Sequence, residues 1–274
     1  MRFSLIGAGK TGSLFSSFLV SKGYEIDYII DKQPEKAKTL ARYLDAGKVS
    51  DGCNFPVIRG TVLIAVKDDE IRKVFKQLWN ANKEIDNFVH FSGMLTSEIF
   101  KEAAEEQKGT ISLHPNLSIK KRFMKPDVLY NTIIGIEGNK KGISFITNLL
   151  KKNGLNFCLI DRNKKVYYHS AAVFASNFTQ ILSLISRILY EKSGIDRETA
   201  TRIVGKFLKD LSTKNETEPL EYTFTGPAIR KDDHTIRMEY EALEAIDPDL
   251  SILYKKLTEL IMKYSSGGDG NEYK

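Results

Sequence analysis

Three glycines near the N-terminus have the spacing of a phosphate-binding loop. Gly7, Gly9 and Gly12 follow the short apolar run Arg2–Ile6 in the pattern GxGxxG. In such a loop the first glycine permits a tight turn, the second lets a pyrophosphate approach bare backbone, and the third lets the next helix pack close to the sheet. The amides that open this helix then face the phosphates. The residues that we expect to bind a dinucleotide here are Gly7, Ala8, Gly9, Lys10, Thr11 and Gly12.

Asp31 and Lys32 end the next apolar run, where the adenosine ribose of a dinucleotide would lie. An acidic side chain at this place accepts hydrogen bonds from the ribose hydroxyls of NAD, whereas a basic one pairs with the extra phosphate of NADP. Because the sequence offers both side by side, the periodicity leaves open which of them faces the ribose, and an ordinary solvated strand end is the alternative. We expect NADP to be preferred, with NAD possible.

Further polar and small residues follow other apolar runs. In an open parallel sheet the ligand lies outside the carboxyl ends of the strands, so the residues just after each run should border the cofactor. Small side chains there would admit a nicotinamide ring. Asp69 is also expected to cap the helix that follows it. The candidate cofactor-binding residues at these strand ends are Val66, Lys67, Asp68, Ser92, Gly93 and His114.

Three residues of the second half of the chain are candidates for catalysis. His169 and Asn177 are eight residues apart on one long helical segment and therefore share roughly one face. Arg230 follows a Gly-Pro turn and could hold a substrate carboxylate in bidentate fashion. The alternatives are a buried, hydrogen-bonded amide for Asn177 and an ion pair of Arg230 with Asp232 or Asp233.

Strands and helices that could position these residues alternate up to about residue 161. The expected strands are 2–6, 26–30, 61–66, 87–91, 110–113, 131–137 and 156–160. The expected helices between them are 11–22, 34–44, 69–79, 97–107 and 141–152, and only helices follow, at 166–191, 196–212, 235–245 and 250–264. This pattern predicts an α/β fold: a doubly wound, mainly parallel Rossmann sheet over 1–161, an all-α domain over 162–264 and a flexible tail over 265–274.

Composition narrows the class of protein. The 274 residues carry a formal charge of +6, but the lysines come in scattered pairs without one basic block, so we expect no nucleic-acid partner. Cys53 and Cys158 are too few for a disulfide framework or a cysteine-rich metal site. We see no signal peptide and no run of about eighteen apolar residues. The expectation is a cytoplasmic protein with no metal and no membrane partner.

Six segments together resemble a known family, the Rossmann-like proteins that carry the domain of unknown function 2520. The resemblance runs in order over nearly the whole chain, and the last two segments are its specific ones. These segments are 7–12, 64–71 (IAVKDDEI), 90–93 (HFSG), 112–115 (SLHP), 169–177 (HSAAVFASN) and 225–233 (TGPAIRKDD). That family is similar in turn to pyrroline-5-carboxylate reductase, ketopantoate reductase and the 6-phosphogluconate dehydrogenase group.

The resemblance implies a Rossmann domain followed by a helical domain that commonly forms dimers, with the active site in the cleft between them. It supplies no substrate. The hydroxy-acid dehydrogenases of that group have a lysine four residues before an asparagine on the central helix, and here Val173 stands four residues before Asn177. In the loop 225–232, Lys231 takes a place where the family often has glycine.

The leading hypothesis is therefore an NADP-preferring oxidoreductase that acts on a small anionic carbonyl or imine. In it His169 donates or orients a proton, Asn177 binds the substrate and Arg230 clamps its carboxylate. One alternative is a dinucleotide-binding sensor without catalysis, which the missing lysine favours. The other is a methyltransferase, which the long helical second half opposes. We expect the protein to form a homodimer through its helical domain.

Overall fold

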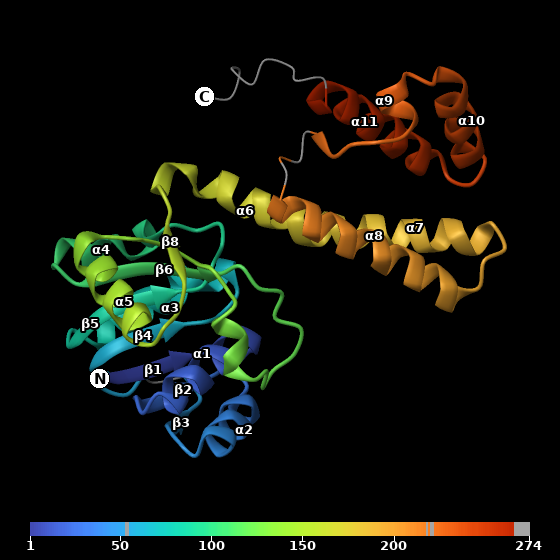
Figure 1. Cartoon of the computed structure of the whole chain (residues 1–274). Coiled ribbons are helices and arrows are strands. Elements are labelled where there is room, and N and C mark those ends of the chain that lie inside the picture. Colours follow the sequence, from blue (N-terminus) through green and yellow to red (C-terminus); the bar gives the residue numbers. More distant parts are fainter. Residues whose placement is uncertain (53–54, 218, 220–221, 266–274) are drawn as a thin grey trace. The chain divides into compact units, whose positions relative to one another are not determined.

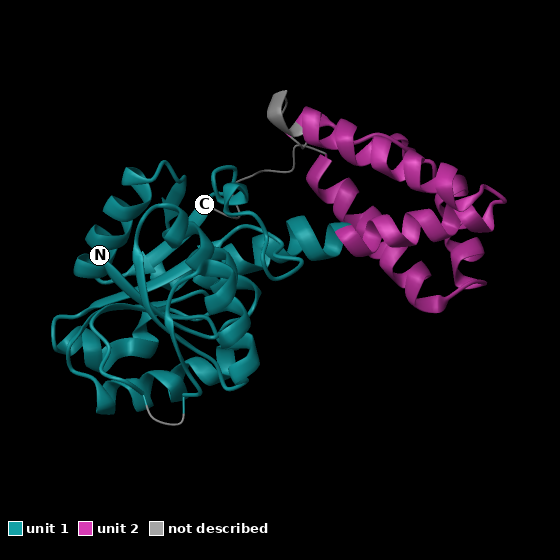
Figure 2. Cartoon of the chain, turned by 90° about the horizontal axis from the view of Figure 1, so that it is seen from below, with its two compact units in different colours: residues 1–179 teal, residues 180–274 magenta. Residues whose placement is uncertain are grey.

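The chain folds into two compact units, residues 1–179 and 180–274, shown in different colours in Figure 2. The structure is a computed structural model, and it describes residues 1–52, 55–217, 219 and 222–265. The boundary between the units falls at residues 179 and 180, inside the long helical segment, whereas the sequence predicts a boundary near residue 161. The tail expected over 265–274 lies outside the described residues apart from Ser265.

The first unit is built on one eight-stranded sheet with the order β3-β2-β1-β4-β5-β6-β7-β8 (Figure 1). All neighbouring strands are parallel except the antiparallel pair β6 and β7. The strands are β1 (Arg2–Ile6), β2 (Glu25–Ile30), β3 (Lys48–Ser50), β4 (Gly60–Ile64), β5 (Ile85–His90), β6 (Gly109–Pro115), β7 (Ile134–Gly138) and β8 (Phe157–Leu159). This confirms the doubly wound, mainly parallel sheet.

Helices connect the strands and continue into the second unit. Those of the first unit are α1 (Lys10–Ser21), α2 (Pro34–Leu44), α3 (Asp68–Ala81), α4 (Lys101–Glu105), α5 (Lys140–Lys152) and α6 (Lys165–Val173), with a π-helix at Phe174–Phe178 and 3-10 turns at Ser97–Phe100, Pro126–Leu129 and Arg162–Lys164. α7 (Thr179–Lys192) begins at the unit boundary. The second unit adds α8 (Arg197–Thr217), α9 (Pro227–Arg230), α10 (Asp233–Glu244) and α11 (Pro248–Ser265).

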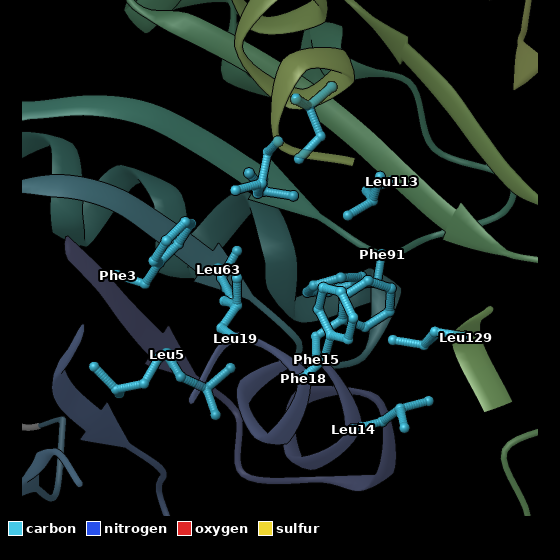
Figure 3. Packing of buried hydrophobic residues seen from close by; sticks show 14 of the residues in the cluster. Phe3, Leu5, Leu14, Phe15, Phe18, Leu19, Leu63, Phe91, Leu113 and Leu129 are labelled. Carbon is cyan, nitrogen blue, oxygen red and sulfur yellow. The ribbon is translucent and has the colours of Figure 1, made fainter. Parts of the chain in front are cut away.

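Successive side chains of the central strands point to opposite faces of the sheet, and both faces are apolar. Phe3, Leu5 and Leu63 point to one face, where α1 supplies Phe15 and Phe18 (Figure 3). The next residues along the same strands, Ile6 and Ile64, belong to a second buried cluster together with Phe75, Phe88 and Phe100. A sheet buried on both faces requires apolar residues at successive positions, which is the pattern of the parallel strands here.

Candidate active site

The glycine loop has the shape that a dinucleotide requires. Gly7 has φ +97°, and a side chain there would run into the carbonyl group of Ala65. A side chain on Gly12 would overlap the carbonyl oxygen of Gly7 and press on Leu5 and Ala65. Gly9, in contrast, has no atom within 4 Å of the place where a Cβ would lie. The backbone at Gly9 is therefore open to a phosphate, and α1 begins directly after it without a side-chain cap.

Asp31 binds the glycine loop itself. Its carboxylate accepts a hydrogen bond from the Ala8 amide at 2.8 Å and another from the Gln33 amide at 2.8 Å. Lys32 turns to Glu70, with Nζ and Oε1 2.6 Å apart, and this hydrogen bond raises the pKa of Lys32. Both residues that the sequence places at the ribose thus have partners within the protein.

A cavity of about 360 Å³ lies beside this end of the loop, and we call it the basic cavity. Gly7, Gly9 and Asp31 contribute to its wall. Its cationic side chains come from the ends of β2 and β4 and from the helices that follow them. These lysines are Lys32, Lys36, Lys67 and Lys73.

The residues after β4 and β5 are joined by hydrogen bonds. Asp68 opens α3 and accepts a hydrogen bond from Ser92 Oγ at 2.5 Å, and Ser92 Oγ accepts from the Leu95 amide at 2.9 Å. The expected cap at Asp69 is wrong, because α3 begins one residue earlier. Lys67 occupies the N-cap position, and no side chain caps this end.

Two histidines, His114 at the end of β6 and His169 on α6, meet over Gly93. Their ring centroids are 5.8 Å apart, and Nδ1 of His114 lies 3.2 Å from the hydroxyl oxygen of Tyr168. Burial, followed by the charge of His169, lowers the pKa of His114 to about 4. Burial also raises the pKa of Tyr168 to about 12. Nδ1 of His169 is buried and has no hydrogen-bond partner among the described residues.

His169 and Asn177 line one cavity of about 630 Å³, which we call the histidine cavity. His114 and Tyr168 lie in the same wall. Its remaining lining consists mostly of small residues of α6 and the π-helix. The structure thus brings together two of the three catalytic candidates, together with a histidine that the sequence places at the cofactor.

Arg230, the third candidate, belongs to the second unit and ends the short helix α9. Its side chain has no salt bridge among the residues that the structure describes. Asp232 instead caps α10, accepting from the Thr235 amide at 3.1 Å, so the ion pair considered for Arg230 is not formed. Lys231 has φ +55°, a conformation in which glycine carries no steric cost, which gives a physical reason for the glycine that the resemblance implies at this place.

Sequence reasoning missed Lys165, the first residue of α6. Its ammonium donates hydrogen bonds to the carbonyl oxygens of Ser92, at 3.0 Å, and Leu95, at 2.5 Å, and to Ser112 Oγ. Burial lowers its pKa to about 8. In the sequence, Lys165 forms one of several lysine pairs with the exposed Lys164, and no local pattern separates the two.

Comparison with known proteins gives a match to one family model over part of the chain. The model of the domain of unknown function DUF2520 matches residues 132–261, so the four segments before residue 116 that carry the resemblance lie outside the matched part. No curated protein matches the sequence.

Solved structures resemble the whole chain. Protein TM1727 from Thermotoga maritima is 26% identical, with a TM-score of 0.75 over 96% of this chain and 98% of that one. The "putative NADP oxidoreductase BF3122" from Bacteroides fragilis is 20% identical, with a TM-score of 0.78 over 96% and 98%. Pyrroline carboxylate reductase from Plasmodium falciparum, solved with NADP bound, is 12% identical, with a TM-score of 0.59 over 96% and 98%. Residues 132–261 thus match the model of the domain of unknown function 2520, and the chain has the Rossmann-type fold of these solved structures.

Proposed function

We propose that the protein is an oxidoreductase that prefers NADP to NAD and acts on a small anionic carbonyl or imine substrate. The observation that carries this proposal is the open backbone at Gly9, beside the basic cavity at the ends of β2 and β4. The histidine cavity begins at the end of β6. The similar folds of the "putative NADP oxidoreductase BF3122" and of a reductase solved with NADP support this proposal.

The preference for NADP rests on the lysines of the basic cavity. Asp31 uses its two carboxylate oxygens on the amides of Ala8 and Gln33, so it supports the loop rather than standing free for a ribose. Lys32 is paired with Glu70, which leaves Lys36, Lys67 and Lys73 as the cations for an additional phosphate. Lysine binds phosphate as a point charge, and three of them would favour the more anionic cofactor.

In the proposed reaction the bound cofactor supplies or accepts the hydride. His169 donates or orients the proton, and its buried, unpartnered Nδ1 supports this role. Asn177 binds the substrate from the wall that it shares with His169. Arg230 is proposed as the carboxylate clamp, because a guanidinium can hold a carboxylate in bidentate fashion.

The proposed partner is a second copy of the chain, bound through the helical part. Large apolar side chains are exposed along the segment that contains the π-helix and α7. They are Phe174, Phe178, Ile181, Leu182, Leu184 and Ile188. An apolar surface of this kind needs a cover in water.

Titration with NADPH and NADH, followed by nicotinamide fluorescence, tests the proposal. We expect NADPH to bind at least about tenfold more tightly, since the charge of the lysines acts on its additional phosphate. Gly9→Val should abolish binding while the protein stays folded, because the space beside Gly9 is empty. Lys36→Met together with Lys73→Met should reduce the preference for NADPH over NADH. Lys76→Met, on the exposed side of α3, is the matched control.

Failure of both cofactors to bind would remove the oxidoreductase proposal. Binding of NADPH without turnover over a panel of oxo acids and imines would instead favour a dinucleotide-binding sensor.

A further inference from the structure

The ammonium group of Lys165 is a buried positive charge held only by neutral oxygens. The residue is 1% exposed. Its three N–H groups go to the carbonyl oxygens of Ser92 and Leu95 and to the hydroxyl of Ser112, which exhausts its donors. Among the residues that the structure describes, no carboxylate lies within salt-bridge distance of it. Lys165 is therefore fixed in place and cannot turn toward a substrate.

The two carboxylates whose charges act on Lys165, those of Glu137 and Asp68, are hydrogen-bonded to other groups. Glu137 accepts hydrogen bonds from Ser97 and pairs with Arg162 Nε at 2.9 Å. Asp68 lies at the exposed start of α3 and accepts from Ser92 Oγ. Solvent screens a charge in such a position, whereas the buried charge of Lys165 acts over a longer range.

Lys165 lies at the half of the sheet where a nicotinamide would be bound. Its partner Ser92 follows β5, and Ser112, in the middle of β6, pairs with His90, the last residue of β5. The sheet reverses its order between β1 and β4, and the loop after β1 receives the pyrophosphate. Because the residues that follow β2 lie where the adenosine ribose would be bound, the nicotinamide half falls on the opposite side of the loop, at β4, β5 and β6. The oxidised nicotinamide ring carries a positive charge, and the reduced ring carries none.

We infer that the buried ammonium of Lys165 makes the site bind the reduced cofactor more tightly than the oxidised one. This inference rests on the proposed function, and it assigns the reaction a direction. Repulsion between Lys165 and the oxidised ring raises the free energy of the complex with NADP⁺ and leaves that with NADPH unchanged. The site thereby favours reduction of its substrate and release of NADP⁺ afterwards.

The ratio of the two dissociation constants, for NADP⁺ and for NADPH, is the measurement that tests this. NADPH is titrated by fluorescence, and NADP⁺ by its competition with NADPH. Lys165→Met should lower the ratio at least about threefold, mainly through tighter NADP⁺, since it removes one charge from a site of reduced dielectric. Lys164→Met removes the same charge from an exposed neighbour and should leave the ratio unchanged. A purely structural role would instead weaken both cofactors alike.

A pH series on the unaltered protein gives an answer even where Lys165→Met fails to fold. Burial lowers the pKa of Lys165 to about 8, so the ratio should fall between about pH 7 and about pH 9.5 as the ammonium loses its proton. The other titratable groups around it are His90, His114, Asp68 and Glu137. Burial lowers the pKa of His90 to about 3 and that of His114 to about 4, so both stay neutral throughout this range.

The outcomes separate the two proposals. A ratio near one that neither pH nor Lys165→Met changes would overturn the inference and leave the proposed cofactor in place. Absence of binding by both cofactors would overturn both.

Discussion

Gly93 holds a place where a side chain would displace both imidazoles of the site. A Cβ there would overlap Nδ1 of His169 and lie 2.9 Å from Nε2 of His114. The two rings therefore pack directly on bare backbone. Their orientation depends on the absence of a side chain at this residue.

Gly93→Ala should push His169 and His114 out of place. We expect a loss of about 1–3 kcal/mol in the free energy of unfolding, as for an overpacked core. We also expect at least a tenfold loss of any turnover that depends on the histidines, because small displacements of reacting groups are costly. Gly205→Ala, in the open surroundings of α8, is the control and should be neutral or slightly stabilising.

NMR titration of the histidines checks Gly93→Ala without a substrate. The chain has only four, so their signals can be assigned. Burial holds the pKa of His114 at about 4, and a ring pushed toward solvent should titrate closer to its usual range. An unchanged titration of His114 would show that the rings do not depend on Gly93.

Single residues differ in how far the sequence predicts them. The glycine loop could be predicted, because its spacing encodes local backbone geometry. Lys165 could not, because its burial depends on acceptors from residues 92, 95 and 112, which only the fold assembles. Asp31 and Lys32 were placed correctly at the end of β2, but their partners Ala8 and Glu70 are distant in sequence.

At the scale of elements, one buried carboxylate connects three of them. Glu137 on β7 accepts hydrogen bonds from the amide and hydroxyl of Ser97, which begins the turn before α4. Arg162, in the turn before α6, donates to the same carboxylate and also pairs with Glu98. This network fixes the start of α6, and therefore the positions of Lys165 and His169.

Arg162→Met should destabilise the protein by about 2 kcal/mol, because it leaves the buried charge of Glu137 with fewer partners. The expected loss in stability is smaller than for a wholly buried ion pair, since the Arg162 side chain is 38% exposed. Urea unfolding measures the change. Arg2→Met breaks an ion pair with Glu25 in which both side chains are exposed, and should cost at most about 1 kcal/mol. Equal losses in the two variants would contradict the role of the network.

Most elements follow from apolar periodicity and its breaks. α2 spans Pro34–Leu44 as expected, since proline favours the first helical position. The apolar periodicity does not predict β3, the helix α9 or the π-helix. β3 has only three residues, and α9 has four in a segment that the sequence presents as a loop. Periodicity needs longer runs, and a π-helix has no local sequence signal of its own.

At the scale of the whole molecule, the long helical segment exposes an apolar surface. The stretch Arg162–Lys192 is long and apolar enough to cross a membrane, by length and composition alone. The criterion is mean hydropathy, and polar residues such as Asn177, Gln180 and Arg187 interrupt the apolar residues of this segment. Phe174 is 65% exposed and Phe178 is 45% exposed, and their rings pack against each other at 4.9 Å. We propose a second copy of the chain as the cover.

Sedimentation velocity should therefore give twice the chain mass of 31.0 kDa. Phe174→Glu together with Phe178→Glu should produce monomers, because a charge in an apolar contact must be desolvated without a partner. Val57→Glu changes an exposed apolar residue elsewhere in the first unit and should leave the mass unchanged. A monomeric unaltered protein, or one that partitions into lipid vesicles, would refute the dimer.

The π-helix at Phe174–Phe178 also affects how this chain is aligned with its relatives. A π turn hydrogen-bonds five residues apart rather than four, and so accommodates one residue more than an α-helical turn. In an alignment with a relative whose α-helix is uninterrupted here, the relative needs a gap of one residue opposite the π-helix. With the gap placed between Ala172 and Asn177, the residue aligned one turn before Asn177 is Ala172 instead of Val173. Neither can carry a proton. The absence of a lysine at this point of the helix is thus independent of where the gap is placed.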